Sequence, residues 1–152
     1  AVYLGGGVPS WVRLLAWTPQ MQHLGPLLVR TIATRGQDFL ENSYDDPSRI
    51  TSEILAGYME PLQVEDWDRA LWYFTMADGP VDLPDRLGEL VVPVLVITGE
   101  NDRIVPTSQS LRLAEEIPGA RLSVIPQAGH LPHEEQPAPF MQAVQVFLES
   151  LE

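Results

Sequence analysis

Two short apolar runs in the last third of the chain each end abruptly in a polar turn. Val91–Thr98 leads into Gly99–Asp102, and Leu122–Ile125 leads into Gln127–His130. Both runs are rich in Val and Ile, are too short for helices and do not alternate with polar residues. That pattern is typical of strands that are buried on both faces of a parallel sheet. We therefore expect two strands of one parallel sheet here.

The stretch from Thr107 to Ile117 lies between the two runs and has the apolar spacing of a helix. Thr107 is a candidate N-cap, and a Pro-Gly pair follows the stretch as a stop signal. Two parallel strands joined by a helix form a right-handed crossover. The crossover places Asp102 and His130 side by side, beyond the carboxyl ends of the two strands. Open α/β sheets hold their functional groups at that edge.

Asp102 and His130 together have the chemistry of an oriented base. A carboxylate that accepts the N–H of an imidazole fixes the tautomer of the ring. The other ring nitrogen is then able to take a proton from a nucleophile or from water. The alternative interpretation is that the two residues are ordinary loop residues at adjacent strand ends. The spacing by itself leaves both interpretations open.

The chain before residue 82 has the pattern of several short helices without a strand between them. The expected helices are Trp11–Trp17, a segment from Pro26 to about Asn42 with a weak point at Gly36, a segment capped by Thr51 that runs towards Pro61, and a segment from Glu65 to Gly79. Gly5–Gly7 precede these helices and are interpreted as a hinge, with an oxyanion-hole loop as the alternative. A closing helix is expected from Pro137, with an apolar stripe at Phe140, Val144, Phe147 and Leu151.

The composition excludes several classes of function. The chain has 21 acidic residues against nine basic ones, and all nine basic residues are arginine. A surface this negative repels phosphate backbones, so nucleic-acid binding is not expected. Without lysine neither a P-loop nor a Schiff base can form, and without cysteine there is no disulfide or thiolate zinc site. No apolar run reaches the length of a membrane span. We expect a bacterial, cytoplasmic protein, although the true N-terminus is not seen.

Two motifs follow the predicted strands. Residues 99–106 read Gly-Glu-Asn-Asp-Arg-Ile-Val-Pro, and residues 129–137 read Gly-His-Leu-Pro-His-Glu-Glu-Gln-Pro. They resemble the G-x-x-D-x-x-x-P and G-H-x-x-H-x-E-x-P segments of the α/β-hydrolase family, in which each segment follows a strand. The resemblance covers the last third of the chain closely and the remainder in general character. It implies that Asp102 is the acid and His130 the base of a catalytic triad.

The resemblance also implies an α/β fold. The expected fold is the C-terminal part of the hydrolase's parallel sheet, two strands with flanking helices, preceded by a helical cap. We place the boundary near Asp82, so that residues 1–81 form the cap and residues 82–152 form the part of the core that carries the acid and the histidine. Caps of this kind cover the active site in many α/β-hydrolases.

The family's nucleophile is not found in this chain. In the family it lies before the acid, on a strand-to-helix elbow of the type G-x-S-x-G. No apolar strand and no flanking glycines accompany the upstream serines at residues 10, 43, 48 and 52. We therefore expect a C-terminal fragment whose partner is the missing N-terminal half of the hydrolase, rather than a degenerate relative. Because two strands leave unpaired edges, the chain alone is expected to be unstable and inactive.

The implied activity is hydrolysis of a small, largely apolar carboxylic ester by a Ser-Asp-His mechanism, without a cofactor. Two alternatives keep the fold: an Asp nucleophile, as in epoxide hydrolases and haloalkane dehalogenases, or C–C bond hydrolysis with a serine. An alternative of another class is a non-catalytic hydrolase-like binding protein. The presence of both Asp102 and His130 argues against it, because a binding pocket does not need the pair.

Other polar and aromatic residues are expected to support the pair. We interpret His133 and Glu134 as holding the His130 loop in place, and Arg103 as pairing with a nearby carboxylate. The H-x-x-H spacing could also suggest a metal, but a loop lacks the one-face geometry that metal ligands have on a helix, so no metal is expected. Four cap aromatics are candidates for an apolar substrate pocket, with packing between helices as the alternative: Trp17, Tyr58, Trp72 and Tyr73.

Overall fold

The computed structural model describes residues 10–77 and 83–151, and these residues divide into two compact units. The unit that we call the sheet unit contains Glu41–Arg49 and the described residues from 83 onwards. The unit that we call the helical unit contains the described residues up to Leu40 and those from Ile50 to residue 77. The inclusion of Glu41–Arg49 in the sheet unit was not predicted. The predicted hinge at Gly5–Gly7, the helix end at Gly79 and the boundary at Asp82 lie outside the described residues.

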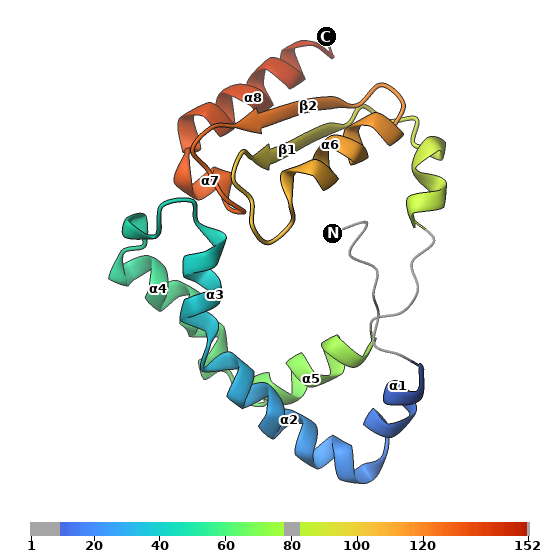
Figure 1. Ribbon diagram of the computed structural model, residues 1–152, viewed down its shortest axis with the longest axis vertical. Coiled ribbons are helices and arrows are strands. Elements are labelled where there is room, and N and C mark those ends of the chain that lie inside the picture. The colour runs from blue at the N-terminus through green and yellow to red at the C-terminus, as the bar shows by residue number, and fades with distance from the viewer. Residues whose placement is uncertain (1–9, 78–82, 152) are drawn as a thin grey trace. The chain divides into compact units, whose positions relative to one another are not determined.

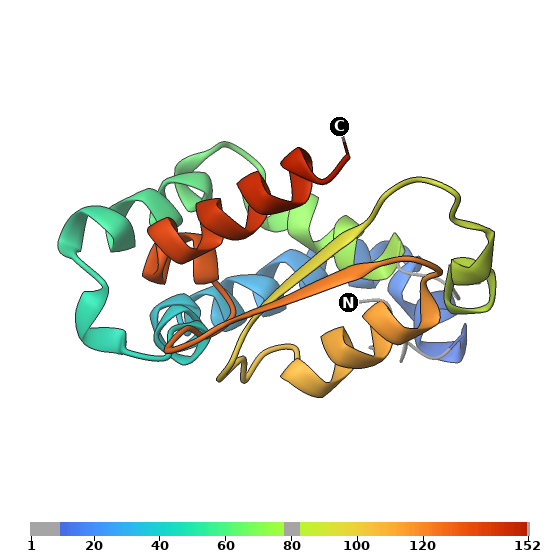
Figure 2. The same cartoon turned by 90° about the horizontal axis from the view of Figure 1, so that it is seen from above.

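The sheet unit is a strand-helix-strand crossover with a helix on each face. The strands β1 (Leu95–Gly99) and β2 (Arg121–Ile125) run parallel, and their register pairs Leu95 with Arg121 and Gly99 with Ile125. Helix α6 (Thr107–Glu116) connects them, and α8 (Pro137–Glu149) lies on the opposite face of the sheet (Figures 1 and 2). The predicted parallel pair and its crossover are therefore confirmed. Two shorter elements complete the unit: the 3₁₀ helix η3 (Leu83–Glu89) and α7 (Pro132–Glu135).

The first strand is shorter than the sequence pattern predicted. The apolar run begins at Val91, but the strand begins at Leu95, and Val91 is 95% exposed. Pro93 explains the difference, because proline has no N–H to donate to a ladder and is found at strand ends or edges. Pairing starts directly after it, where the carbonyl of Val94 accepts a hydrogen bond of 2.9 Å from the N–H of Arg121.

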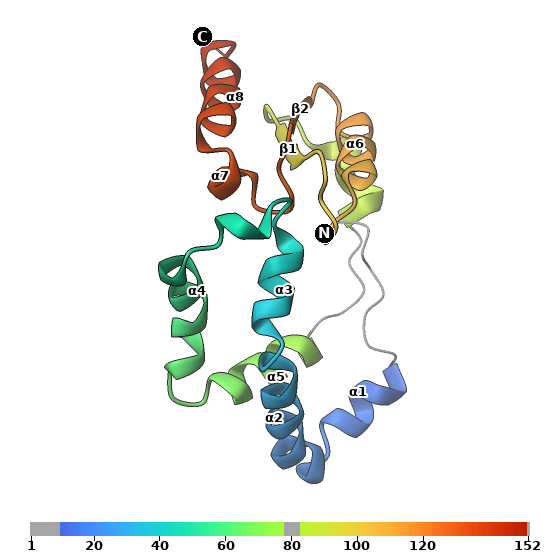
Figure 3. The ribbon, with the colours of Figure 1, turned by 60° about the vertical axis from the view of Figure 1, so that its left-hand side comes forward.

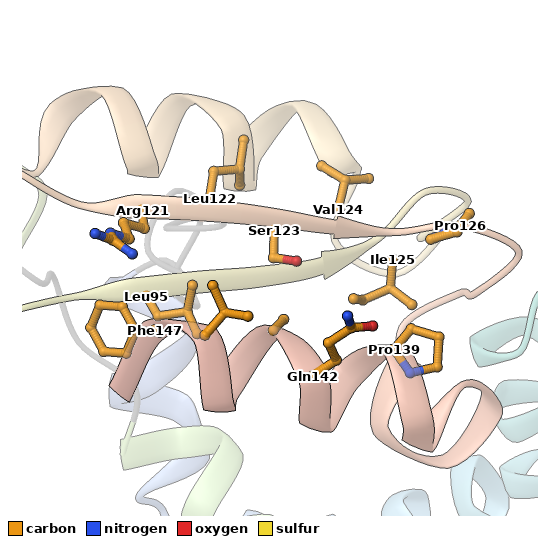
Figure 4. A pocket seen from close by; sticks show the side chains of 12 residues that line it. Leu95, Arg121, Leu122, Ser123, Val124, Ile125, Pro126, Pro139, Gln142 and Phe147 are labelled. Atoms are coloured by element: carbon orange, nitrogen blue, oxygen red, sulfur yellow. The ribbon is translucent and has the colours of Figure 1, made fainter. Parts of the chain in front are cut away.

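The prediction that both strands are buried on both faces is wrong for β2. Leu122 and Val124 are each 40% exposed. Figure 4 shows these two side chains on the α6 side of the sheet, whereas Ser123 and Ile125 point towards α8. Because α6 packs mainly on β1, it leaves the outer strand partly uncovered. On the other face an open groove separates β2 from α8, with Pro139, Gln142 and Phe147 along its helical wall (Figure 4).

The start of α6 also differs from the prediction. Its N-cap is Pro106, and no side chain caps the helix. The hydroxyl of Thr107 instead donates to the carbonyl of Gly99 at 2.7 Å, so the residue ties the helix start to the end of β1. The predicted stop is confirmed: Gly119 follows the helix with a φ of +72°, a conformation that glycine adopts without steric cost.

The helical unit is built from short helices, as predicted. These are α1 (Ser10–Ala16), α2 (Pro19–Ala33), α3 (Gly36–Ser43), α4 (Ser52–Met59), the 3₁₀ helix η2 (Glu60–Gln63) and α5 (Trp67–Ala77). The last residues of α3 and the 3₁₀ helix η1 (Pro47–Arg49) belong to the sheet unit. Thr51 caps α4 by accepting a hydrogen bond of 3.2 Å from the N–H of Ile54, which confirms that prediction. No helix among the described residues is long and apolar enough to cross a membrane.

The prediction of one segment from Pro26 to about Asn42 is wrong at its start. Helix α2 begins at Pro19, a first-turn position that proline favours, and it runs through Pro26. A proline inside a helix costs ~3 kcal/mol or more. The packing of the helix against α5, with Gly25 and Val29 buried one turn apart, outweighs that cost. The predicted weak point is confirmed, because a break separates α2 from α3 just before Gly36.

The core of the helical unit lies between α2 and α5, which Figure 3 shows next to each other. Trp72 is 7% exposed and packs with Ala16 and Val29. A Cβ added at Gly25 would lie 2.2 Å from the Trp72 ring, so only glycine allows this approach. At the edge of the core, Arg30 Nε donates to Asp68 Oδ2 at 2.6 Å. Burial alone would raise the pKa of Asp68, but the hydrogen bonds from Arg30 and from the N–H of Arg69 lower it below its ordinary value.

Candidate active site

The two residues that follow the strand ends meet in the sheet unit. His130 Nδ1 lies 2.9 Å from Asp102 Oδ2, a hydrogen-bonding distance. The Asp102 side chain is 6% exposed, whereas the His130 side chain is 35% exposed. The predicted juxtaposition is therefore confirmed. A carboxylate below an imidazole that can still be reached is the arrangement that an oriented base requires.

The carboxylate of Asp102 is held by its own loop. Its second oxygen, Oδ1, accepts hydrogen bonds from the N–H groups of Ile104 at 2.9 Å and Val105 at 2.8 Å. An aspartate that accepts bonds from the backbone two and three residues further on makes a compact turn. Because both oxygens are engaged, the side chain cannot rotate away from His130. An ionised carboxylate can only accept, so Nδ1 is the donor in this pair, and Nε2 is the ring nitrogen outside it.

The loops that carry the acid and the histidine are bonded to each other through their backbones. The N–H of Glu100 donates to the carbonyl of Ile125 at 2.9 Å, and the N–H of Asn101 donates to the carbonyl of Ala128 at 3.0 Å. A Cβ on Gly99 would lie 2.0 Å from the carbonyl oxygen of Gly129, so the close approach of the two loops requires glycine at the end of β1. The pair thus sits on one rigid strand-end platform rather than on two independent loops.

One residue of the histidine loop has a left-handed backbone. Gln127 has a φ of +52°, which is uncommon outside glycine. Its carbonyl accepts a hydrogen bond of 3.1 Å from Gln136 Nε2, and its N–H lies 3.3 Å from Glu100 Oε2. These contacts hold the turn that directs the chain from β2 to His130. Backbone strain of this kind occurs frequently at functional sites.

The three supporting residues predicted from the sequence lie beside this platform. Arg103 lies 3.7 Å from the carboxylate of Asp45 and 3.4 Å from the carbonyl of Tyr44, so the expected carboxylate partner is present. His133 lies 3.6 Å from the carboxylate of Glu134, and Glu134 accepts a hydrogen bond from the hydroxyl of the buried Tyr44. The contacts of Arg103 and Glu134 with the segment after α3 agree with a supporting role, which stays a prediction for all three residues.

Glu135 was not predicted as a site residue, yet its carboxylate bonds both to this platform and to the segment after α3. It is 3% exposed and accepts hydrogen bonds from the N–H of Gly129 at 2.6 Å and the N–H of Asp45 at 2.7 Å. A signal for it exists in the sequence, since Glu135 occupies the fixed acidic position of the G-H-x-x-H-x-E-x-P motif.

The four aromatic residues proposed for a pocket all lie in the helical unit. Trp72 is buried in the core of that unit. Trp17 is 56% exposed and stacks on Tyr73 with ring centroids 6.2 Å apart, and Arg69 lies over the Tyr73 ring. Tyr58 is 41% exposed. A pocket role for these residues stays a prediction. Among the described residues no group of three His, Asp or Glu could hold a metal ion.

A comparison with family models assigns the chain to a family. Residues 1–143 match the model of the alpha/beta hydrolase family. The chain belongs to the alpha/beta hydrolase family. This confirms the fold class that the two motifs implied, and it makes a hydrolase the expected kind of enzyme.

Relatives and solved structures that resemble this chain include proteins named as 2-hydroxy-6-oxo dienoate hydrolases, as a meta-cleavage product hydrolase and as an esterase. The chain is 32% identical over 107 residues to a 2-hydroxy-6-oxononadienedioate/2-hydroxy-6-oxononatrienedioate hydrolase of Pseudomonas putida. The match covers 68% of this chain and 37% of the relative. A meta-cleavage product hydrolase from Pseudomonas fluorescens shares the fold with a TM-score of 0.61 at 25% identity, over 76% of this chain and 45% of that one. A thermophilic esterase from Thermogutta terrifontis matches with a TM-score of 0.56 at 26% identity, over 88% of this chain and 51% of that one.

The matches cover only part of each relative. The chain spans about a third to a half of the length of the curated relatives it matches, with shares of 36%, 37% and 50% for three of them. The activity of a whole hydrolase therefore remains a matter for proposal.

Proposed function

We propose that this chain supplies the acid and the base of a hydrolase that acts on a small, largely apolar carboxylic ester. The observation that carries the proposal is the 2.9 Å contact between His130 Nδ1 and Asp102 Oδ2, with the carboxylate fixed by two backbone N–H groups. A base in one tautomer, beside a buried negative charge that stabilises its protonated form, is what acyl transfer to water needs.

In the proposed reaction His130 Nε2 takes the proton of a serine hydroxyl while the serine oxygen attacks the ester carbonyl. The imidazolium then gives that proton to the leaving alcohol as the C–O bond breaks, which leaves an acyl-enzyme. His130 next takes a proton from water as the water oxygen attacks the acyl carbonyl, and the imidazolium then returns that proton to the serine oxygen as the bond to the acyl group breaks, which releases the carboxylic acid. Asp102 keeps its charge throughout and stabilises the imidazolium.

The nucleophile and the oxyanion donors belong, in this proposal, to a polypeptide that precedes residue 1 and completes the sheet. The helical unit would act as its cap. Two observations support such a partner: the matches cover only 36%, 37% and 50% of three relatives, and β1 and β2 pair only with each other among the described strands. An aspartate nucleophile, as in epoxide hydrolases, would use the same base against an alkyl ester intermediate.

A second candidate is hydrolysis of a C–C bond next to a carbonyl. The names of several relatives favour it, since they are hydrolases of 2-hydroxy-6-oxo dienoates. The same pair would serve, but the leaving group would be a carbon that His130 must protonate instead of an alcohol oxygen.

The test uses the complete protein encoded by the source gene, assayed with short-chain nitrophenyl esters and with a 2-hydroxy-6-oxo dienoate. We expect ester turnover that His130→Ala abolishes and that Asp102→Asn lowers by about 10⁴-fold, because the amide favours the wrong tautomer. A higher kcat/KM on the dienoate would move the assignment to C–C hydrolysis. Full activity in His130→Ala would overturn both candidates, and a complete protein without turnover on any such substrate would favour a binding role.

A further inference from the structure

Glu135 is a buried carboxylate that the proposed chemistry does not use. It ends the one-turn helix α7 and is 3% exposed. Its Oε2 accepts a hydrogen bond of 2.6 Å from the N–H of Gly129, the residue before His130. Its Oε1 accepts from the N–H of Asp45 at 2.7 Å and from the N–H of Asp46 at 3.3 Å. Since a buried charge is stable only when hydrogen bonds replace its water, these three N–H groups account for its place in the fold.

The segment that Glu135 holds, Ser43–Asp46, also contacts the histidine loop directly. The N–H of His130 donates to the carbonyl of Ser43 at 2.7 Å. A Cβ on Gly129 would lie 2.5 Å from that same oxygen, so the two backbones touch. Figures 1 and 3 show the turn after α3 beside α7, which agrees with these contacts. The main chain of the base is thus bonded to Ser43 and, through Gly129, to Glu135.

We propose that Glu135 is a positioning residue for catalysis: it sets the place of the His130 main chain, as Asp102 sets the orientation of the ring. This inference rests on the proposed function, because it takes His130 as the base. Glu135 acts through Gly129 and the Ser43–Asp46 segment and has no contact with substrate. The effect can be large, because a displacement of about 1 Å in a reacting group lowers rates by ~100-fold.

A carboxylate suits this position better than any neutral side chain of the same shape. Both of its oxygens face backbone N–H groups, so both must accept. An amide offers one acceptor and one donor group. In Glu135→Gln the NH₂ group would therefore face a backbone N–H, either that of Gly129 or that of Asp45. The hydrogen bond to that N–H would be lost. The size of the side chain, and with it the packing around α7, would be unchanged.

The experiment compares Glu135→Gln with wild type in the complete hydrolase, using the nitrophenyl ester. We expect kcat to fall by about tenfold to a hundredfold, while KM changes by less than about twofold because substrate contacts are intact. The downfield proton resonance of the Asp102–His130 hydrogen bond should shift or broaden. Glu135→Asp, which restores two acceptor oxygens, should recover part of kcat. The matched control is Glu115→Gln, an exposed glutamate on α6, which should change neither kcat nor the resonance.

Several results would overturn the role of Glu135. One is a wild-type kcat in folded Glu135→Gln, and another is equal loss in the Gln and Asp variants with an unchanged resonance. If Glu135→Gln does not fold, Arg49→Gln is tested in its place, because exposed Arg49 donates to the main-chain carbonyl of Glu135 at 2.5 Å. An unchanged kcat in Arg49→Gln would count against the proposal, and a several-fold lower kcat would support it.

His130→Ala distinguishes a failure of the proposed function from a failure of this inference. Activity without the imidazole overturns the proposed function. An inactive His130→Ala beside a fully active Glu135→Gln overturns only the role of Glu135.

Discussion

The helical unit is held together mainly by apolar contacts, whereas the loops around His130 are bonded by many hydrogen bonds to backbone groups. Between α2 and α5 the contacts are those of Val29 and Trp72 across a glycine, with one ion pair at the edge. Around the histidine they are backbone N–H groups directed at two carboxylates, those of Asp102 and Glu135. Apolar contacts are not directional and permit small shifts, but a hydrogen bond weakens steeply when its angle changes. The two regions are therefore held by contacts that differ in their sensitivity to direction.

This difference predicts opposite responses to substitution. In the helical unit we expect changes in stability that follow volume. Around the histidine we expect changes in activity that follow single hydrogen bonds. The following variants of the complete hydrolase separate the two responses.

The largest effect on stability is expected from Trp72→Ala. The side chain is 7% exposed and forms the centre of the α2–α5 contact. Truncation of a buried aromatic residue to alanine lowers the free energy of unfolding by about 3–5 kcal/mol, through lost burial and the cavity that remains. Urea denaturation followed by circular dichroism measures it. Phe74→Ala, on the same helix but 76% exposed, is the control and should cost far less. Similar losses in the two variants would contradict the assigned core.

Gly99→Ala is expected to combine a smaller loss of stability with a loss of activity. The new Cβ would lie 2.0 Å from the carbonyl oxygen of Gly129, which is backbone and cannot rotate aside. Overpacking of this kind costs about 1–3 kcal/mol. Because the loops of Asp102 and His130 would be pushed apart, kcat should fall by ~100-fold. Parallel measurement of the unfolding midpoint and kcat tests both parts. An enzyme that is destabilised but fully active would show that the platform is less rigid than its contacts indicate.

The elements that the sequence predicted best are those with a clear local signal. The two strands, the stop at Gly119 and the meeting of Asp102 with His130 follow from short apolar runs that end in motifs. The burial of Leu122 and Val124 was misjudged, because a sequence pattern cannot show how far α6 covers the outer strand. Tertiary packing likewise carried α2 through Pro26, against its local preference.

The inclusion of Glu41–Arg49 in the sheet unit had no signal in the sequence. Several of the contacts that hold this segment are made by its backbone groups, such as the carbonyl of Ser43 and the N–H groups of Asp45 and Asp46. Every residue has these groups, so their pairing leaves no pattern of residue types. The hydrogen bonds of Glu135 could not be predicted for the same reason, because its partners are backbone N–H groups, although the residue occupies a fixed position of the motif.

Gly25→Ala tests the close packing of α2 on α5 with a smaller expected effect. Alanine is favoured over glycine in a helix by up to ~1 kcal/mol, which by itself would stabilise the protein. The new Cβ would lie 2.2 Å from the Trp72 ring, however, and the ring would have to move. We expect a net loss of about 1 kcal/mol. The control is Gly57→Ala in α4, where nothing lies within 4 Å of the new Cβ and a gain is expected. A gain at both positions would contradict the close contact.

The smallest effect concerns the Arg30–Asp68 pair and appears only as a pH dependence. The pKa of Asp68 is lowered in the folded state, so its charged form stabilises the fold above the ordinary value of 3.8, and that contribution is lost as the pH falls through the lower folded value. The stability difference between wild type and Asp68→Asn should therefore shrink as the pH falls from about 5 to about 3. Urea midpoints at each pH measure it, with Glu65→Gln as an exposed control that should show no such trend. Because Arg30 is 61% exposed, solvent screens the pair, and the shift should remain well below that of Trp72→Ala. A pair whose loss mattered as much as the tryptophan would remove the contrast between an apolar helical unit and a polar histidine platform.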